Sequence, residues 1–156
     1  MKLKFMVVDV YNTILNKSSI EYNLEEYLEE TNKIGKIFLS KYSKEINKIV
    51  KLLPKITRKR WPKCLGNEIE VYFVKYKGPS FAYPLTLKVR GDLLFMLVIL
   101  THELGHRFFD GYGSEKDIND LTEKVFEKLK INTKKQIALI RTFNNSTNKL
   151  ISPNFL

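Results

Sequence analysis

LLFMLVILTHELGHRFF, residues 93–109, is the stretch that decides the fold of this chain. It is almost wholly apolar and follows Asp92, a residue type that commonly caps the start of a helix. It ends at DGYG, residues 110–113, whose two glycines favour a turn. A run of this length and composition predicts one buried helix around which the other elements are packed.

The predicted helix contains His102-Glu103-Leu104-Gly105-His106, which holds both histidines of the protein. Residues four apart project from the same face of an α-helix, so both imidazoles can bind one metal ion. Glu103 lies about 100° round the helix, where its carboxylate can reach a water on that metal. The pattern would arise by chance on the order of one time in a thousand. Two core histidines without a metal are the blander interpretation, but burying such groups unpaired is costly.

HELGH after a long apolar run resembles the active-site helix of zincin metallopeptidases, and SEKDIND, residues 114–120, is similar to the second helix of gluzincins. Within about residues 65–130 the chain most resembles the short soluble minigluzincins and the ImmA/IrrE-type peptidases. The resemblance implies a small α+β zincin-like domain. That domain would have a short mixed sheet with a backing helix, an HExxH active-site helix and a following ligand-bearing helix.

The resemblance also implies the chemistry. One catalytic Zn²⁺ would activate a metal-bound water, and Glu103 would act as general base in hydrolysing a peptide bond. Asn119 stands where the resembled families place an acid or amide that orients a ligand histidine. The substrate would be a peptide or a protein, and the protein would be a hydrolase of the metalloprotease class.

A catalytic zinc usually has three protein ligands, and no third histidine exists. The side chains that could complete the site are Asp110, Glu115, Asp117, Asp120, Glu123 and Cys64. In the helix predicted after residue 114, a rotation of 100° per residue places Glu115 near the buried direction and Asp120 nearly opposite. We therefore expect His102, His106 and Glu115 to hold the metal. Asp120 is the next choice if that helix begins later, and Asp117 is explained by a capping box.

The other segments predict short strands and amphipathic helices. The expected strands cover 2–10, 68–77 and 85–89, and the expected helices cover 24–53, the residues after the capping box at 114–117, and 134–143, with a polar tail over 144–156. Gly35 is a candidate bend in the first helix, and Pro54 should stop it. By the zincin resemblance, one of the strands over 68–77 and 85–89 is expected to be an edge strand that holds the substrate backbone.

Length and composition favour one globular domain of 156 residues, 44% of them hydrophobic. We expect a single zincin-like metallopeptidase domain over 1–156, with its catalytic core over 64–130. The amino terminus lacks a signal-like pattern, and the longest apolar run, 93–100, is too short to span a bilayer. Cys64 is the only cysteine, which excludes an internal disulfide. A cytoplasmic monomer is therefore expected.

Two further interpretations stay open. In the first, the zinc site belongs to a latent or non-catalytic regulatory module whose cleft is filled by the apolar tail, residues 152–156, or by the Cys64 thiolate. In the second, the protein is associated with nucleic acid, because the net charge is +10 and KITRKRWPK, residues 55–63, joins basic residues to Trp61. The lysines are spread over most of the chain, so charge alone does not decide.

Overall fold

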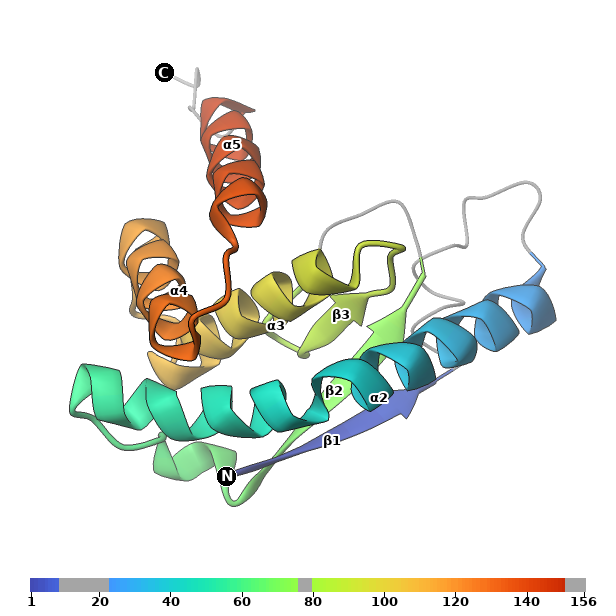
Figure 1. The fold of residues 1–156 in the computed structure, drawn as a ribbon, viewed down its shortest axis with the longest axis horizontal. Coiled ribbons are helices and arrows are strands. Elements are labelled where there is room, and N and C mark those ends of the chain that lie inside the picture. The colour runs from blue at the N-terminus through green and yellow to red at the C-terminus, as the bar shows by residue number, and fades with distance from the viewer. Residues whose placement is uncertain (9–22, 76–79, 151–156) are drawn as a thin grey trace, which may run out of the picture.

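The computed structural model describes residues 1–8, 23–75 and 80–150. Its elements, in chain order, are β1 (Lys2–Val7), α2 (Leu24–Thr57), the 3-10 turn η1 (Lys63–Leu65), β2 (Glu68–Val74), β3 (Thr86–Lys88), α3 (Leu93–Phe108), α4 (Glu115–Leu129) and α5 (Lys134–Leu150). A small sheet packs against α2 and α3, and α4 packs on both of these helices (Figure 1). The predicted α+β class is therefore confirmed. None of the helices in these residues has the length and apolarity needed to cross a membrane.

The sheet has the strand order β1-β2-β3, and both strand pairs are parallel. This differs from the mixed sheet expected from the sequence. Helix α2 forms a long crossover between β1 and β2, and such a connection permits parallel pairing. Among the described residues, antiparallel pairing is limited to one bridge, between Phe81 and Thr86. The segment at Phe81 therefore lies beside β3 but does not form a fourth strand.

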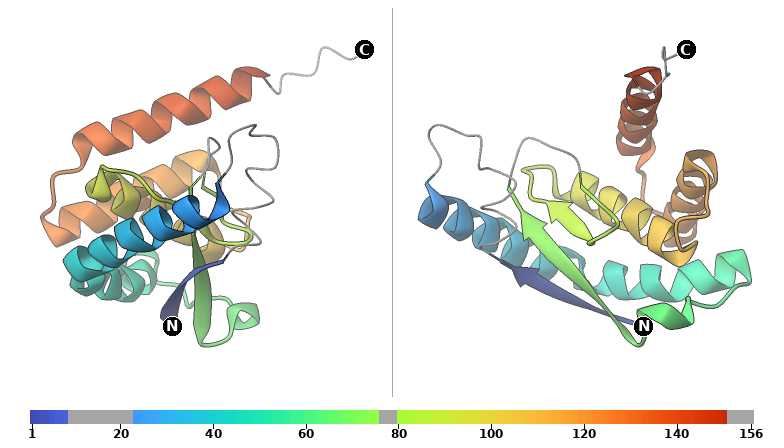
Figure 2. Two further views of the ribbon diagram at one scale, coloured as in Figure 1. Left: turned by 90° about the vertical axis from the view of Figure 1, so that its right-hand side faces the viewer. Right: turned by 180° about the vertical axis from the view of Figure 1, so that it is seen from behind.

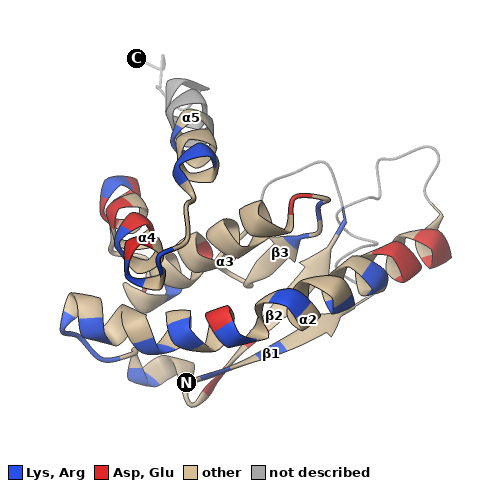
Figure 3. Cartoon of the chain, viewed as in Figure 1, with Lys and Arg blue, Asp and Glu red and all other residues tan. Residues whose placement is uncertain are grey.

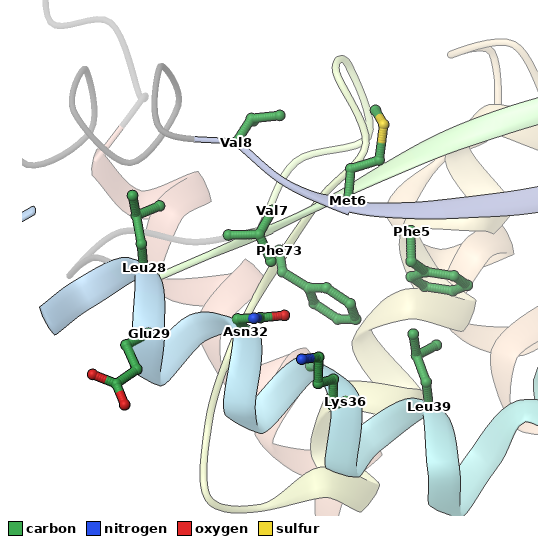
Figure 4. Close-up of a pocket in the computed structure, with 11 residues that line it drawn as sticks. Phe5, Met6, Val7, Val8, Leu28, Glu29, Asn32, Lys36, Leu39 and Phe73 are labelled. Atoms are coloured by element: carbon green, nitrogen blue, oxygen red, sulfur yellow. The ribbon is translucent and has the colours of Figure 1, made fainter. Parts of the chain in front are cut away.

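The two faces of the sheet have different surroundings. Phe5 and Val7 point toward α2, whereas Met6 points to the other side (Figure 4). On that outer side, Lys4 Nζ lies 3.1 Å from Glu70 Oε1 of the neighbouring strand. One face of the sheet therefore joins the hydrophobic core, and the other carries charge.

Gly35 marks a close contact between α2 and the sheet. A Cβ atom at this position would lie 2.9 Å from Cδ2 of Phe73, which is closer than real side chains pack. Phe73 also meets Phe38 of α2 edge to face, with the ring centroids 6.0 Å apart. Helix α2 continues through Gly35, so this glycine provides room for the β2 ring inside one unbroken helix.

Helix α2 also continues through Pro54 and ends at Thr57, so the predicted stop at Pro54 is wrong. Proline has no N–H to donate to the carbonyl four residues earlier, which is that of Val50. Trp61 Nε1 instead donates to Val50 O at 3.3 Å, and the indole packs edge-on against Phe108 with a centroid separation of 4.9 Å. The indole thus replaces the missing backbone donor, and it is held by this packing instead of being presented for base stacking.

We expect Trp61→Phe to lower the free energy of unfolding by about 1–3 kcal/mol, because a partly buried carbonyl loses its donor. The phenyl ring keeps aromatic packing against Phe108. Urea unfolding followed by circular dichroism measures the loss. Adding Pro54→Ala restores an N–H opposite Val50 O and should recover most of the lost stability. A double variant no more stable than Trp61→Phe would show that the indole acts only through packing.

Helix α5 extends to Leu150, seven residues beyond its predicted end at 143. The predicted tail over 144–156 is therefore helical as far as 150. No glycine or proline occurs between 134 and 150, so nothing in the sequence blocks propagation of the helix. Helix α5 lies beyond α3 and α4, away from β1 (Figure 2). Residues 152–156, which were expected to fill the cleft in a latent form, lie outside the described residues.

Candidate metal centre

Helix α3 (Leu93–Phe108) forms as predicted. Asp92 Oδ1 accepts a hydrogen bond from Phe95 N at 2.9 Å and caps its N-terminus. Ten of its sixteen residues are buried, and only 4% of the surface of His102 is exposed. His106, one turn later, is half-buried. The helix therefore holds one imidazole inside the protein and the other at the edge of its core.

A short reversal brings α4 back to the histidines. Asp110 and Gly111 adopt left-handed backbone conformations, with φ of 52° and 78°. Gly111 N donates to His106 O at 3.1 Å, which ties the turn to the end of α3. Ser114 then caps α4, whose first residue is Glu115. Glu115 thus begins a helix beside the last turn of α3, and its negative charge is favoured at a helix N-terminus.

Gly105, inside the HELGH pattern, allows α3 and α4 to approach closely. A Cβ atom at this position would lie 3.0 Å from Cγ2 of Ile118, so a larger residue would push on α4. Ile118 itself is fully buried. The glycine therefore helps to set the distance between the histidines and Glu115.

The three side chains predicted as ligands converge. His102 Nε2 and His106 Nε2 lie 3.1 Å apart. The carboxylate of Glu115 lies 3.2 Å from His106 Nε2 through Oε1 and 3.4 Å from His102 Nε2 through Oε2. Donors at 2.0–2.1 Å from a tetrahedral zinc are separated by about 3.3 Å. The two Nε2 atoms are close to that spacing, and each carboxylate oxygen of Glu115 lies at a similar distance from one of the two histidines. Within the described residues, no other group of three His, Cys, Asp or Glu side chains converges in this way.

The electrostatics of the cluster also favour a cation. Hydrogen bonding to His102 and His106 holds the pKa of Glu115 well below its usual range. The hydrogen bond with Glu115 raises the pKa of His106, although burial opposes that rise. Two Nε2 lone pairs this close repel each other unless a proton or a metal ion lies between them. The cluster therefore offers an anionic, partly desolvated site for a dication.

Glu103 lies on the same helix but is not one of the three converging residues. Its carboxyl is half-buried, and burial raises its pKa. Charge on His102 and His106 opposes that increase, and the negative charge of Glu115 adds to it. A carboxyl group whose pKa is raised holds a proton more readily, which suits it to accept and return one.

Asn119 reaches the inward side of α4, where only 8% of its surface is exposed. In the part of the chain that the structure describes, no hydrogen bond joins it to His102 or His106. His102 Nδ1 is buried and also has no hydrogen-bond partner in that part of the chain. The structure thus brings Asn119 close to the core of the α3–α4 pair without showing the orienting contact that the sequence predicted.

The other candidate ligands lie outside the cluster; they are Asp110, Asp117, Asp120, Glu123 and Cys64. Asp117 Oδ2 accepts a hydrogen bond from Ser114 N at 3.3 Å and completes the capping box. Asp120 faces Arg141, with an Oδ1 to NH2 distance of 3.7 Å. Cys64 is exposed in η1. The structure therefore favours Glu115 over the alternatives left open by the sequence.

Tyr83 is a neighbour of the site that sequence reasoning missed. Its hydroxyl donates to His106 O at 3.3 Å, and the guanidinium of Arg107 lies over its ring, 4.5 Å from the centroid. Burial raises the pKa of Tyr83, and the positive charge of Arg107 opposes the rise. Tyr83 precedes β3 in an irregular segment, where no periodic pattern could identify it. It connects that segment to the helix that carries the histidines.

The sheet edge that was expected to bind the substrate backbone is already hydrogen-bonded to other residues of this protein. β2 is the central strand, so it cannot be the edge. On β3, Thr86 N donates to Phe81 O at 2.8 Å and Lys88 N donates to Ser80 Oγ at 3.0 Å. These N–H groups are the ones that an added strand would use. A peptide could pair with β3 only by replacing Ser80 and Phe81.

Two hollows lie elsewhere on the molecule. One, of about 700 Å³, lies between β1 and the N-terminal half of α2 (Figure 4). The other, of about 830 Å³, is lined by residues from the end of α2, the turn after α3, and α4. None of the three converging residues lines either hollow, so neither is the cleft for a peptide at the metal centre.

No protein-family model, curated protein or solved structure matches this chain. The function must therefore be argued from the residues of the site.

Proposed function

We propose that this protein is a zinc-dependent peptidase. The observation that carries the proposal is the convergence of His102, His106 and Glu115 from two helices at the spacing of zinc ligands. Only the two histidines share one helix, so sequence periodicity alone did not require Glu115 to join them. The adjacent Glu103 adds the acid–base group that hydrolysis needs.

In this mechanism, His102, His106 and Glu115 would hold the metal. Zinc, when bound, would lower the pKa of a water molecule and polarise the scissile carbonyl. The carboxylate of Glu103 accepts a proton from the attacking water and delivers it to the nitrogen of the leaving amine. The raised pKa of Glu103 supports this role, because the carboxyl can hold the proton between the two steps.

The simplest rival account is a hydrogen-bonded His–His–Glu cluster that binds no metal. Thermal unfolding with and without added zinc separates the two. Free zinc at 100 times its dissociation constant should stabilise the folded protein by about 2.7 kcal/mol, and a chelator should remove the effect. His106→Ala should show no zinc-dependent shift in melting temperature. The rival account is correct if zinc leaves the melting temperature of the wild-type protein unchanged.

A second candidate function is a zinc-containing regulatory module without turnover. Ser80 and Phe81 accept hydrogen bonds from the edge of β3, which is the expected position of a substrate strand. This occupied edge favours the regulatory module. Both candidates predict zinc binding, whereas only the peptidase predicts peptide hydrolysis that depends on Glu103. Incubating the zinc-loaded protein with a mixed peptide library and measuring cleavage by mass spectrometry distinguishes them.

A further inference from the structure

One face of α2 carries a row of exposed lysines. The row consists of Lys33, Lys36, Lys41, Lys44, Lys48, Lys51 and Lys55. At 100° per residue, all but Lys36 fall within an arc of about 80°, and at 1.5 Å per residue the row is about 33 Å long. Basic residues recur along α2, and acidic residues gather at its N-terminal end (Figure 3). The structure thus converts a scattered sequence pattern into a line of charge.

No ion pair neutralises this lysine row within the described residues. The lysines that do pair with carboxylates there are Lys4, with Glu70, and Lys75, with Glu30, and neither belongs to the row. Several neighbours in the row are three or four residues apart, a spacing at which like charges on a helix repel each other. A polyanion bound along the row would relieve this repulsion.

We propose that the lysine row binds the phosphate backbone of double-stranded nucleic acid without reading its bases. A duplex presents closely spaced phosphates in a line, and lysine side chains can neutralise them along the length of α2. Beyond α2 the chain adds further exposed basic residues, which are Arg58, Lys59, Arg60 and Lys63. The bound duplex could therefore extend past the C-terminal end of the helix.

Other features of α2 disfavour a membrane surface. Its inward-facing residues Phe38, Ile49 and Leu53 are fully buried and cannot insert into lipid, and Ile37, which is 49% exposed, adds a single apolar side chain to the outer surface of the helix. Four acidic residues occupy its N-terminal end, where a flat anionic surface would meet them; they are Glu25, Glu26, Glu29 and Glu30. A duplex can avoid that end, because it needs to follow only the row.

Single-stranded nucleic acid is also disfavoured as the ligand of the lysine row. Binding of single strands relies on aromatic side chains on which bases stack. Trp61, the aromatic residue beside the basic run, donates through Nε1 to Val50 O and packs against Phe108. The lysine row can therefore contact only the phosphates, and such contacts do not depend on the base sequence of the nucleic acid.

The test is fluorescence anisotropy with labelled 20-base-pair DNA and RNA duplexes at 50–200 mM NaCl, using both zinc-free and zinc-loaded protein. If five of the seven lysines contact phosphates, the slope of log K against log salt should be about −4.5, and affinity should fall about 500-fold over that range. Both duplexes should bind, because both present a phosphate backbone. The proposal does not depend on zinc, so its outcome is separate from that of the peptidase.

The decisive variant is Lys41→Gln/Lys44→Gln/Lys48→Gln/Lys51→Gln, which should reduce the slope to about −1. Its control removes four exposed lysines from α4 and α5 and has the same net charge: Lys124→Gln/Lys128→Gln/Lys134→Gln/Lys135→Gln. Circular dichroism checks that both remain folded. The proposal is overturned if both variants lose equal affinity, or if the wild-type slope is shallower than about −2. It is also overturned if the row is required for binding to phosphatidylserine vesicles but not to duplexes.

Discussion

Glu103→Gln should greatly slow peptide hydrolysis while leaving zinc binding intact. Glutamine has nearly the same shape as glutamate but cannot accept the proton of the attacking water, so turnover should fall by about 10²–10⁴-fold. Glu103 lies outside the converging ligand set, so the metal should remain bound. The measurements are kcat on a peptide substrate and the zinc content of the same sample.

The matched control for this variant is Glu123→Gln. Glu123 lies on α4 and pairs with Arg141 at 2.9 Å, outside the converging group. The Glu123→Gln substitution removes the same charge by the same chemical change, and this variant should retain both zinc and turnover. Full activity in Glu103→Gln would refute the proposed proton transfer. Loss of zinc in that variant would instead make Glu103 part of the metal site.

Glu115→Ala should weaken zinc binding by more than about a hundredfold. Loss of a group that only supports a ligand costs about 10–100-fold in affinity, and loss of a ligand should cost at least as much. The two histidines remain on α3 in this variant, so residual binding measures what they achieve alone. Competition with a chromogenic chelator gives the dissociation constants.

Asp120→Ala is the control that separates the two carboxylates left open by the sequence. Asp120 is on the same helix and carries the same charge, but it faces Arg141. Its removal should leave the zinc affinity unchanged. A larger loss in Asp120→Ala than in Glu115→Ala would mean that α4 binds the metal through a different face.

The sequence was sufficient to predict the elements whose signals are local. Helix α3 has an apolar run with a capping aspartate, and it formed with both histidines on one side. Glu115 could be favoured over Asp120 because the buried stripe of α4 fixes which way each carboxylate points. The position of Glu115 also depends on the tight turn at Asp110 and Gly111, whose breaker residues were visible in the sequence.

The features that the sequence did not reveal depend on contacts between distant residues. Pro54 predicts the end of a helix when only local sequence is considered. The helix continues because the indole of Trp61, which lies outside the helix, supplies the missing donor. Ser80 and Phe81 lie between the two strands predicted over 68–77 and 85–89, yet they bond to the edge of β3. Tyr83 reaches the carbonyl of His106 across 23 residues. None of these contacts has a periodic signal, so folding in three dimensions was needed to show them.

The central claim is that two imidazoles and one carboxylate share a zinc ion. A crystal structure of the zinc-loaded protein, with anomalous data at the zinc edge, tests it most directly. We predict that His102 Nε2, His106 Nε2 and a carboxylate oxygen of Glu115 lie within about 2.2 Å of the metal. Protein that retains no transition metal, or zinc bound by a set that lacks either histidine, would contradict the account.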